Sequence, residues 1–377
     1  MMGTVLNLFS QEAYQEDSQL VSVTDTEEES TIVRPIHISF ITPISTNGMQ
    51  SGEVTNIFSF NMIAGYSGGL QGFEVAGFAN VIKGDTKGVQ LAGFSNTNRG
   101  DVDAFQAAGF TNVALGEVNG MQAAGFANVA RKEIRALQVA GFSNVAGGMS
   151  VGGQISGFAN VNRGDAKGVQ IAGFSNVNTG DIAGAQVSGF LNTARKVDGV
   201  QIGFINVADT IANGVGIGFL TFVKHGYKSF EISANETFYG NLSFKTGTER
   251  LYNIISIGAS PKNNEILWGW GYGLGTMFPV SEKMKLNIEA VSFHVNEDVW
   301  FTHRLNSLNK LNVAVEYKVG KFMTVYGGPT WNVHVSQLYY VEGVPTSSSL
   351  VGWKTFDRTR NSVNVKMYPG FTVGVRL

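Results

Sequence analysis

Residues 168–176 read GVQIAGFSN, and close copies of this stretch recur at a constant step of sixteen residues. A fixed short period indicates a repeat architecture, in which each copy is one structural unit that stacks on its neighbours. The repeat therefore organises about 150 residues as one body. The full copies occupy 72–80, 88–96, 104–112, 120–128, 136–144, 152–160, 168–176 and 184–192, and two shorter copies begin at Gly199 and Gly214.

Three side-chain columns run through these copies. Phenylalanine recurs at the seventh position, asparagine at the ninth and glutamine at the third, where Glu74 replaces it in the first copy. Identical residues at a constant step suit a coil whose turns stack in register, because Phe then packs on Phe and each Asn amide can bond to the next. The columns predict a β-solenoid, a rod about 45–50 Å long at ~4.8 Å per coil. The ladder residues expected to hold it together are Phe94, Asn96, Phe110, Asn112, Phe126, Asn128, Phe142, Asn144, Phe158, Asn160, Phe174 and Asn176.

The competing geometry is an antiparallel meander, in which each copy is one strand and the Arg-Gly-Asp-type segments between copies are hairpin turns. The solenoid is favoured because strict alternation would place Gln, Phe and Asn on one face and Val, Leu, Gly and Ser on the other. Neither face would then suit lipid or a polar lumen. Within the solenoid we expect Val169, Ile171, Phe174 and Val177 to point inward.

The sequence around the repeat alternates with period two, which is typical of strands. Residues 363–377 alternate apolar side chains with polar or small ones over fifteen positions. Such runs exceed the ~5–6 residues usual for a strand, and their division into an aromatic side and a polar side favours a barrel in an outer membrane. Candidate strands are 56–66, 228–246, 251–261, 266–280, 283–296, 308–319, 322–335 and 363–377, with 36–44 as a further one.

These patterns predict an all-β chain in which the solenoid is inserted in an antiparallel barrel of about 8 to 10 strands. Residues 1–34 are expected to be a signal remnant with an acidic, solvated tail, 35–70 to supply the N-terminal barrel strand or strands, 71–222 to be the solenoid, and 223–377 to complete the barrel. Short turns face the periplasm in such barrels. With the solenoid between the first two strands, parity would send it outward.

The repeat stretch at 168–176 resembles the bacterial surface-repeat proteins of spirochaetes and Bacteroidetes, and the flanking strands resemble small outer-membrane barrels. The likeness covers about 72–222. It implies a location in the cell envelope and carries over no catalytic residues. The chain lacks the Cys that lipoprotein members use as an anchor, which favours anchoring by the barrel, and it ends in Leu377 where such barrels usually end in an aromatic residue.

The composition argues against several kinds of chemistry. Twenty-seven basic and 29 acidic residues give a net charge of −2, so we expect no nucleic-acid partner. The chain has no Cys, its five His show no metal-binding spacing, and it contains neither a phosphate-binding loop nor a nucleophile elbow. We therefore expect no cofactor, no metal and no enzymatic activity. The Arg-Gly-Asp tripeptides at 99–101 and 163–165 are read as turns, because Lys-Gly-Asp and Thr-Gly-Asp occupy the same repeat position.

A polar network is expected inside the barrel, because a barrel of about eight strands fills its lumen with side chains. Its predicted members are Lys285, Glu289, Glu316, Lys318 and Lys366. The sequence thus favours a non-catalytic outer-membrane or cell-surface protein, structural or binding, that presents a repeat stalk from a barrel anchor. Its expected partners are outer-membrane lipid and an unknown protein or glycan. Two alternatives stay open: a small-solute channel in which the repeats form further barrel strands, and a soluble periplasmic or secreted solenoid that binds a ligand.

Overall fold

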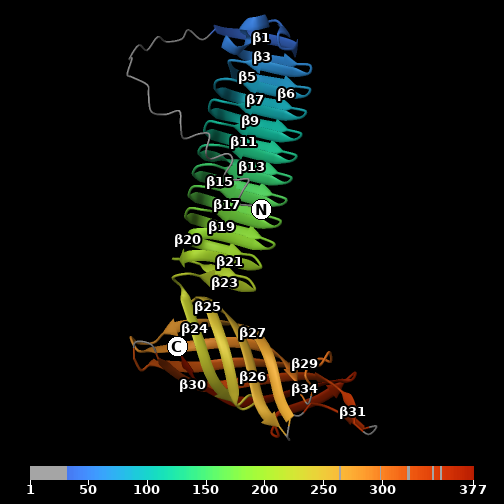
Figure 1. Ribbon diagram of the computed structural model, residues 1–377, viewed down its shortest axis with the longest axis vertical. Helices are drawn as coiled ribbons and strands as arrows, with labels where there is room; N and C mark the ends of the chain where they lie inside the picture. Colours follow the sequence, from blue (N-terminus) through green and yellow to red (C-terminus); the bar gives the residue numbers. More distant parts are fainter. Residues whose placement is uncertain (1–31, 263–264, 298, 321–322, 342–343, 349) are drawn as a thin grey trace.

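Two kinds of β-sheet divide the chain in the computed structural model, which describes residues 32–262, 265–297, 299–320, 323–341, 344–348 and 350–377. A parallel β-solenoid of about eleven coils forms a long rod, and an antiparallel eight-stranded barrel closes at one end of it (Figure 1). The prediction of an all-β solenoid with a barrel of about 8 to 10 strands is confirmed. Most of the predicted signal remnant and acidic tail lies outside the described residues.

Each sixteen-residue coil contains one long and one short strand. Both pair in parallel with their counterparts one repeat away, so that Gln122 lies opposite Gln138 and Asn128 opposite Asn144. This pairing confirms the solenoid and excludes the meander. The long strands are β5 (Gly69–Ala76), β7 (Thr86–Ala92), β9 (Val102–Ala108), β11 (Val118–Ala124), β13 (Ile134–Ala140), β15 (Ser150–Ser156), β17 (Ala166–Ala172) and β19 (Ile182–Ser188). The short strands are β4 (Ala64–Ser67), β6 (Ala79–Ile82), β8 (Ser95–Asn98), β10 (Thr111–Ala114), β12 (Ala127–Ala130), β14 (Ser143–Ala146), β16 (Ala159–Asn162) and β18 (Ser175–Asn178).

The last coils are less regular. They are built from β20 (Leu191–Ile202), β21 (Ile205–Ile211), β22 (Val215–Ile217) and β23 (Leu220–Val223). β20 continues across the turn and pairs with both β18 and β19. The two degraded copies of the repeat therefore remain part of the solenoid and lead directly into the barrel.

The N-terminal segment begins the solenoid, so the prediction that residues 35–70 supply barrel strands is wrong. It consists of β1 (Ile32–Ile41), β2 (Ile44–Ser45), the 3-10 helix η1 (Gly48–Glu53) and β3 (Val54–Asn61). β1 pairs in parallel with β3, which pairs in parallel with β5. Exposed Ile36 and Ile38 alternate with buried His37 and Ser39 as they would in a barrel strand. Alternation alone could not distinguish the two settings, because the outside of this solenoid is itself apolar.

The predicted inward positions of the solenoid lie on its outside, so that prediction is wrong. Val169, Ile171 and Phe174 are 44%, 40% and 42% exposed, and Val177 is half-buried. The interior holds the Gln and Asn columns instead, with Ala among them; Gln170 and Asn176 are buried. Stacking is close at the glycine that precedes each Phe, where a Cβ on Gly173 would lie 2.1 Å from the carbonyl oxygen of Gly157. Mutually bonded amides, small residues and an apolar column that includes Val102, Val118 and Ile134 fill this narrow interior, and the Phe ring turns outward.

Eight strands form the barrel wall, and β24 pairs with β34 to close it. The predicted single strand 228–246 is in fact the hairpin β24–β25. Its turn contains Glu236. The carboxylate of Glu236 forms an ion pair with Lys310 and accepts a hydrogen bond from the backbone N–H of Phe371. This extra strand restores the count of eight without an N-terminal contribution. The wall strands are β24 (Tyr227–Asn235), β25 (Gly240–Thr248), β26 (Leu251–Lys262), β27 (Glu265–Pro279), β28 (Met284–Asn296), β29 (Asn306–Lys318), β30 (Thr324–Gln337) and β34 (Val363–Arg376).

The two ends of the barrel differ in their connections. Turns 249–250, 280–283 and 319–323 are short and lie at the end where the solenoid joins the start of β24. The opposite end carries the longer connections 297–305 and 338–362, which include the hairpin β31 (Tyr339–Val341) and β32 (Val344–Thr346) and the strand β33 (Phe356–Arg360), paired with β34. The prediction of an outward solenoid counted one barrel strand before the repeat. The strands before the repeat belong to the solenoid, so that premise is wrong.

Candidate functional site: the apolar edge of the solenoid and the filled barrel

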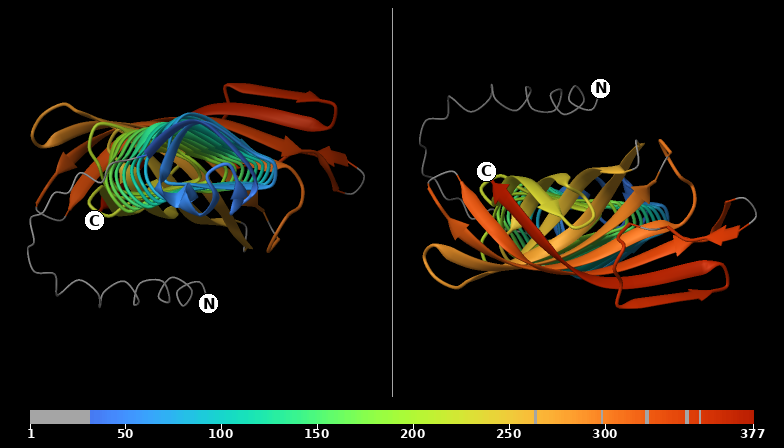
Figure 2. Two further views of the ribbon diagram at one scale, coloured as in Figure 1. Left: turned by 90° about the horizontal axis from the view of Figure 1, so that it is seen from above. Right: turned by 90° about the horizontal axis from the view of Figure 1, so that it is seen from below.

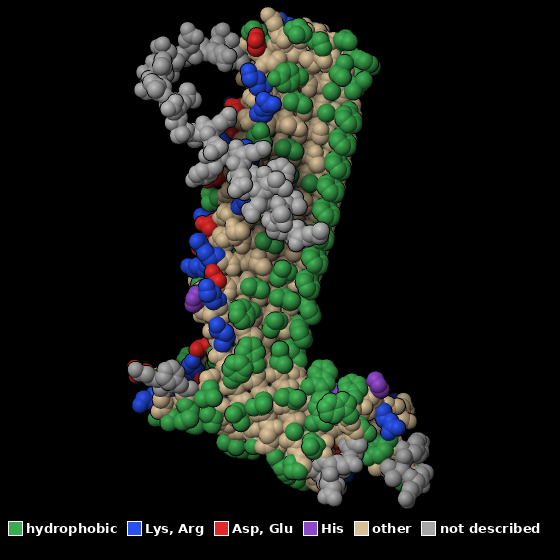
Figure 3. Space-filling view, viewed as in Figure 1, with side chains coloured by type: hydrophobic (Ala, Val, Ile, Leu, Met, Phe, Trp, Pro, Cys, Tyr) green, Lys and Arg blue, Asp and Glu red, His purple; other side chains and the backbone are tan. Residues whose placement is uncertain are grey.

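A ladder of stacked phenylalanine rings forms one edge of the solenoid. From Phe78 to Phe190, ring centroids of successive coils lie 4.7–5.1 Å apart with nearly parallel planes. The ladder continues through Phe204 and Phe219, and its rings are 38–51% exposed. Figure 3 shows apolar side chains along this edge and Lys, Arg, Asp and Glu along the opposite one. The rod is therefore amphipathic across its width.

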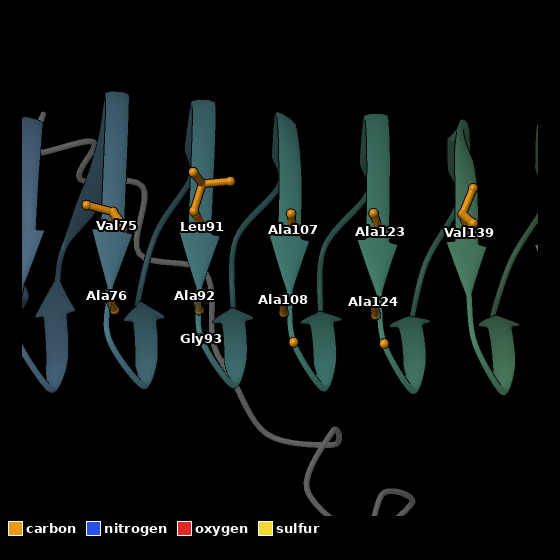
Figure 4. Close-up of a pocket in the computed structure, with 12 residues that line it drawn as sticks. Val75, Ala76, Leu91, Ala92, Gly93, Ala107, Ala108, Ala123, Ala124 and Val139 are labelled. Atoms are coloured by element: carbon orange, nitrogen blue, oxygen red, sulfur yellow. The ribbon is translucent and has the colours of Figure 1, made fainter.

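A shallow groove of about 400 Å³ runs beside the ladder (Figure 4). Its wall is the fourth-position column, in which Val75, Leu91 and Val139 flank the smaller Ala107 and Ala123. The glycines of the sixth position also line it. The groove exists because two adjacent coils carry Ala where their neighbours carry larger aliphatic residues. It offers an apolar, rigid surface with a repeat along its length.

Two amide ladders hold the interior together. Asn128 Nδ2 donates to Asn144 Oδ1 at 2.9 Å, and the same bond links Asn columns from Asn61 to Asn206. The glutamines form the second ladder, in which Gln138 Nε2 donates to Gln122 Oε1 at 2.8 Å. Buried polar groups are tolerated when they are hydrogen-bonded, and these ladders bond them to one another. The Asn and Gln columns are the source of the solenoid's coil-to-coil specificity.

The Gln ladder ends near the N-terminus at the carboxylate of Glu74. Gln90 Nε2 donates to one carboxylate oxygen of Glu74 at 2.9 Å, while Ser59 Oγ and Asn61 Nδ2 donate to the other. Burial raises the pKa of the Glu74 carboxyl above its usual value. Ser59 Oγ also hydrogen-bonds His37 Nδ1 at 3.0 Å, and burial lowers the pKa of this His. Both groups lie inside the rod and are inaccessible, so we assign them a structural role.

Charged side chains fill the barrel lumen next to the solenoid. Arg376 reaches Glu231, Glu289 and Glu316 at 2.7, 2.8 and 2.6 Å. Lys245 contacts Glu231 at 2.5 Å and Glu289 at 2.6 Å. The hydroxyl of Tyr252 donates to Glu289 at 2.7 Å, and Asn287 donates to Glu316. The cluster joins six of the eight strands across the barrel: β24, β25, β26, β28, β29 and β34.

The five predicted lumen residues have different fates. Glu289 and Glu316 belong to this cluster. Lys366 is buried near the opposite end, where it donates to Ser347 Oγ at 2.9 Å and to the carbonyl of Ser348. Lys285 instead pairs with Glu249 at a short turn, and Lys318 is exposed at the end of β29.

Sequence reasoning missed Lys245, Glu231 and Arg376. Their parity in the alternating runs could have indicated an inward position. Lys245 and Glu231 lie on the paired strands β24 and β25, whereas Arg376 meets Glu231 only through barrel closure, which pairs β24 with β34.

The described residues leave little space in this part of the lumen. A void of about 30 Å³ lies among Glu231, Glu289, Lys310, Tyr326 and neighbouring polar side chains. That volume holds on the order of one water molecule. The lumen is thus packed where the solenoid joins the barrel.

A more open pocket of about 480 Å³ lies among the longer loops at the opposite end. Phe301, Arg304, Leu305, Gln337 and Tyr339 contribute to its lining. The Arg304 guanidinium stands 5.8 Å from the centroid of the Tyr339 ring. The pocket combines apolar and polar side chains and lies as far from the solenoid as the barrel allows.

Within the described residues, no group of three or more His, Asp or Glu side chains is arranged to hold a metal ion, and no helix is long and apolar enough to cross a membrane. No protein-family model, no curated protein and no solved structure matches this chain. The resemblance to bacterial surface-repeat proteins therefore stays a prediction. The fold by itself defines the class: an all-β protein that joins a β-solenoid to a closed eight-stranded antiparallel barrel.

Proposed function

We propose that this protein is a non-catalytic outer-membrane protein whose barrel anchors a rigid solenoid rod. The observation that carries the proposal is the distribution of side chains across the barrel wall. Phe230, Leu242 and Phe371 are 66%, 58% and 58% exposed on the outside, whereas Glu231 and Lys245 are buried inside.

This distribution suits lipid better than water. A soluble barrel buries apolar side chains in its interior, while an outer-membrane barrel presents an apolar band outward and polar residues inward. A continuous apolar wall of this size would also be an aggregation liability in water. Closure of the wall leaves no unpaired strand edge, as the hydrocarbon region requires.

The rod is proposed to stand on the periplasmic side. Short turns face the periplasm in barrels of this kind, and the solenoid joins the end that carries them. This orientation reverses the expectation from sequence parity. The longer loops and their pocket would then face outward.

The contents of the lumen argue against the alternative of a solute channel. The cluster of Arg376, Lys245 and three Glu residues spans the lumen, and the void beside it is about 30 Å³. The repeats also form a separate parallel sheet, so they do not widen the barrel.

A rigid rod with an apolar groove favours a binding or structural role. The groove beside Ala107 and Ala123 is lined by aliphatic side chains and backbone, a surface that suits apolar side chains of a protein better than the hydroxyl groups of a glycan. We therefore propose a protein partner for the part of the rod that lies away from the barrel.

Fractionation of expressing cells tests the anchor. We expect recovery in the outer membrane and a change of gel mobility on boiling, which is the behaviour of a closed barrel. Recovery as a soluble protein without a mobility change would refute the proposal.

Single cysteines test the orientation, because the chain contains none of its own. Val299→Cys lies in a long loop and Leu115→Cys on the charged edge of the rod, and both side chains are exposed. A membrane-impermeant maleimide should label Val299→Cys on intact cells and Leu115→Cys only after the outer membrane is opened. The opposite labelling pattern would place the rod outside.

A further inference from the structure

The last coil of the solenoid rests on the outer wall of the barrel, beside its mouth. Thr221 N–H donates to Asn253 Oδ1 at 2.8 Å, and Asn253 Nδ2 donates to the carbonyl of Gly218 at 2.9 Å. Thr246 Oγ1 donates to the carbonyl of Thr221, and the Tyr272 hydroxyl to that of Gly218. Thr246 and Asn253 follow the lumen residues Lys245 and Tyr252, so strand alternation turns them outward. The rod therefore covers part of the wall that lipid would otherwise contact.

The contact extends from Thr246 and Asn253, each two residues from the turn between β25 and β26, to Tyr272, farther along the wall. Tyr272 is seven residues from each end of β27 (Glu265–Pro279) and belongs to the same outward row as Trp270 and Leu274, which are exposed. At ~3.3 Å per residue and a tilt of ~40°, Tyr272 stands about 18 Å from the end with the short turns. The apolar band of such barrels is about 25 Å tall. A coil that touches Tyr272 is thus itself within the band.

The phenylalanine ladder runs directly into this wall. The Phe219 ring stacks on the Tyr272 ring at a centroid distance of 4.8 Å, and Phe204 stacks on Phe219 at 5.0 Å. The exteriors of the last two coils are apolar to match: Ile202, Phe204, Ile217, Phe219 and Phe222 are 41–48% exposed. The apolar surface is therefore continuous from barrel to rod.

The interior of these coils meets the demands of a lipid setting. Asn192 Nδ2 donates to Asn206 Oδ1 at 3.0 Å, and Asn206 Nδ2 donates to the carbonyl of Ile217 at 2.9 Å. β20 pairs in parallel with β21, and β21 with β23, so one side of the last strand has its backbone groups bonded within the solenoid. Arg195, Asp209 and Lys224 occupy the twelfth repeat position, at the opposite edge, whereas Asp198 is exposed on β20 on the same side as Ile202.

We propose that the last two coils, Leu191–Val223, are immersed in the membrane, with the edge at Phe204 and Phe219 in contact with lipid acyl chains. The charged edge then faces headgroups and water. This inference rests on the proposed function, since it requires the barrel to be inserted. Lipid is the favoured occupant because the exposed edge is continuous with the barrel's own lipid-facing wall. A second copy of the chain over the same edge is an outcome of the test.

Single-cysteine fluorescence tests the proposal in the full-length protein, reconstituted in phosphatidylcholine vesicles. Phe204→Cys and Phe219→Cys report on the edge. Lys224→Cys is the matched control on the opposite edge of the last coil, Phe110→Cys the control in the same column far from the barrel, and Phe371→Cys the control on the barrel wall. All five side chains lie on the surface, and a heat-dependent gel shift verifies folding of each labelled variant. Each carries an environment-sensitive maleimide dye, quenched either by lipids with nitroxide-labelled acyl chains or by iodide in the water.

We expect the nitroxide lipids to quench the dyes at 204, 219 and 371 at least twofold more than those at 110 and 224, and iodide to show the reverse order. Equal nitroxide quenching at 110 would overturn the restriction of immersion to the last two coils. Iodide quenching at 204 and 219 equal to that at 110 would overturn the inference while 371 remains lipid-quenched. Protection of 204 and 219 from both quenchers would also overturn it and indicate a second copy. Failure of the lipid to quench 371 would instead refute the proposed function.

Discussion

Truncation of one asparagine in the middle of the amide ladder tests which side of the coil carries its stability. Asn128 is fully buried. Its Oδ1 accepts from Asn112 Nδ2 at 2.9 Å, and its Nδ2 donates to Asn144 Oδ1 at 2.9 Å and to the carbonyl of Val139 at 2.8 Å. Asn128→Ala removes these three hydrogen bonds and a longer one, 3.3 Å, from Nδ2 to the carbonyl of Gln122, and it leaves their partners buried.

The cost follows from these contacts. A buried partner left without its hydrogen bond costs about 1–3 kcal/mol, and three such losses with partial relaxation give about 3–5 kcal/mol. The matched control is Val129→Thr, the next residue along the chain, which is half-buried and faces outward. Thr97 occupies the same column in another coil, so we expect this change to cost less than about 0.5 kcal/mol.

Amide hydrogen exchange of the full-length protein in detergent micelles measures both effects locally. In Asn128→Ala, amides of the coils on either side of residue 128 should exchange roughly two to four powers of ten faster, since each 1.36 kcal/mol is about a factor of ten. In Val129→Thr they should change by less than about threefold. Equal exchange in the two variants would contradict the assignment of coil stability to the buried amide ladder.

Four further changes follow from the same contacts. Glu74→Gln introduces the amide that the other copies carry in this column. Burial raises the folded-state pKa of Glu74 above 4.5. The stability linked to its protonation is therefore present below about pH 4.5 and is lost as pH rises through the folded-state pKa. Over that pH interval the melting temperature of the wild type should therefore fall relative to that of Glu74→Gln. Parallel curves of melting temperature against pH for the two proteins would disprove the linkage. Gly125→Ala places a Cβ 2.1 Å from the carbonyl oxygen of Gly109. It should destabilise the rod by about 1–3 kcal/mol in thermal unfolding. An unchanged unfolding transition would show that neighbouring coils can separate freely. Deletion of residues 88–183, six whole repeats, should shorten the rod in electron micrographs yet preserve the heat-modifiable barrel, whose loss would exclude modularity. Arg376→Gln removes one side of three buried ion pairs and should cost about 3–5 kcal/mol, seen as a lower temperature of the gel-mobility shift; an unaltered shift would show that the lumen cluster is dispensable.

The repeat made the solenoid predictable, but not which side of it faces inward. Strict alternation would place Gln170 and Phe174 on the same face, yet Gln170 is buried and Phe174 is exposed, because Phe174 lies in the bend between β17 and β18. The choice of Phe as interior followed the usual preference of aromatic residues for a core. The coil is too narrow for that preference, since the glycine before each Phe stacks against the carbonyl of the previous coil. Polar amides that bond to their own copies occupy the interior instead.

The barrel was predictable strand by strand, with two errors of the same origin. Residues 35–70 and 228–246 both alternate, yet the first pairs in parallel within the solenoid and the second folds back at Glu236. Period two reports that one face differs from the other, and it does not report the strand's partner. The lumen cluster shows the same limit. Glu289 and Glu316 were predicted, while Arg376, which joins them, is brought to them only when the first and last strands meet.

The sequence by itself determined the local repeat: a sixteen-residue step, the columns that stack on one another and the alternation of the barrel strands. These are properties of neighbouring residues and of identical copies, so the period alone specifies them. Tertiary structure decided which face of each coil is inside, which strands close the barrel, and at which end the rod is attached. Those features depend on the space between coils and on contacts between distant segments, such as Phe219 with Tyr272. No local pattern encodes such contacts, because they arise only when the two bodies are assembled.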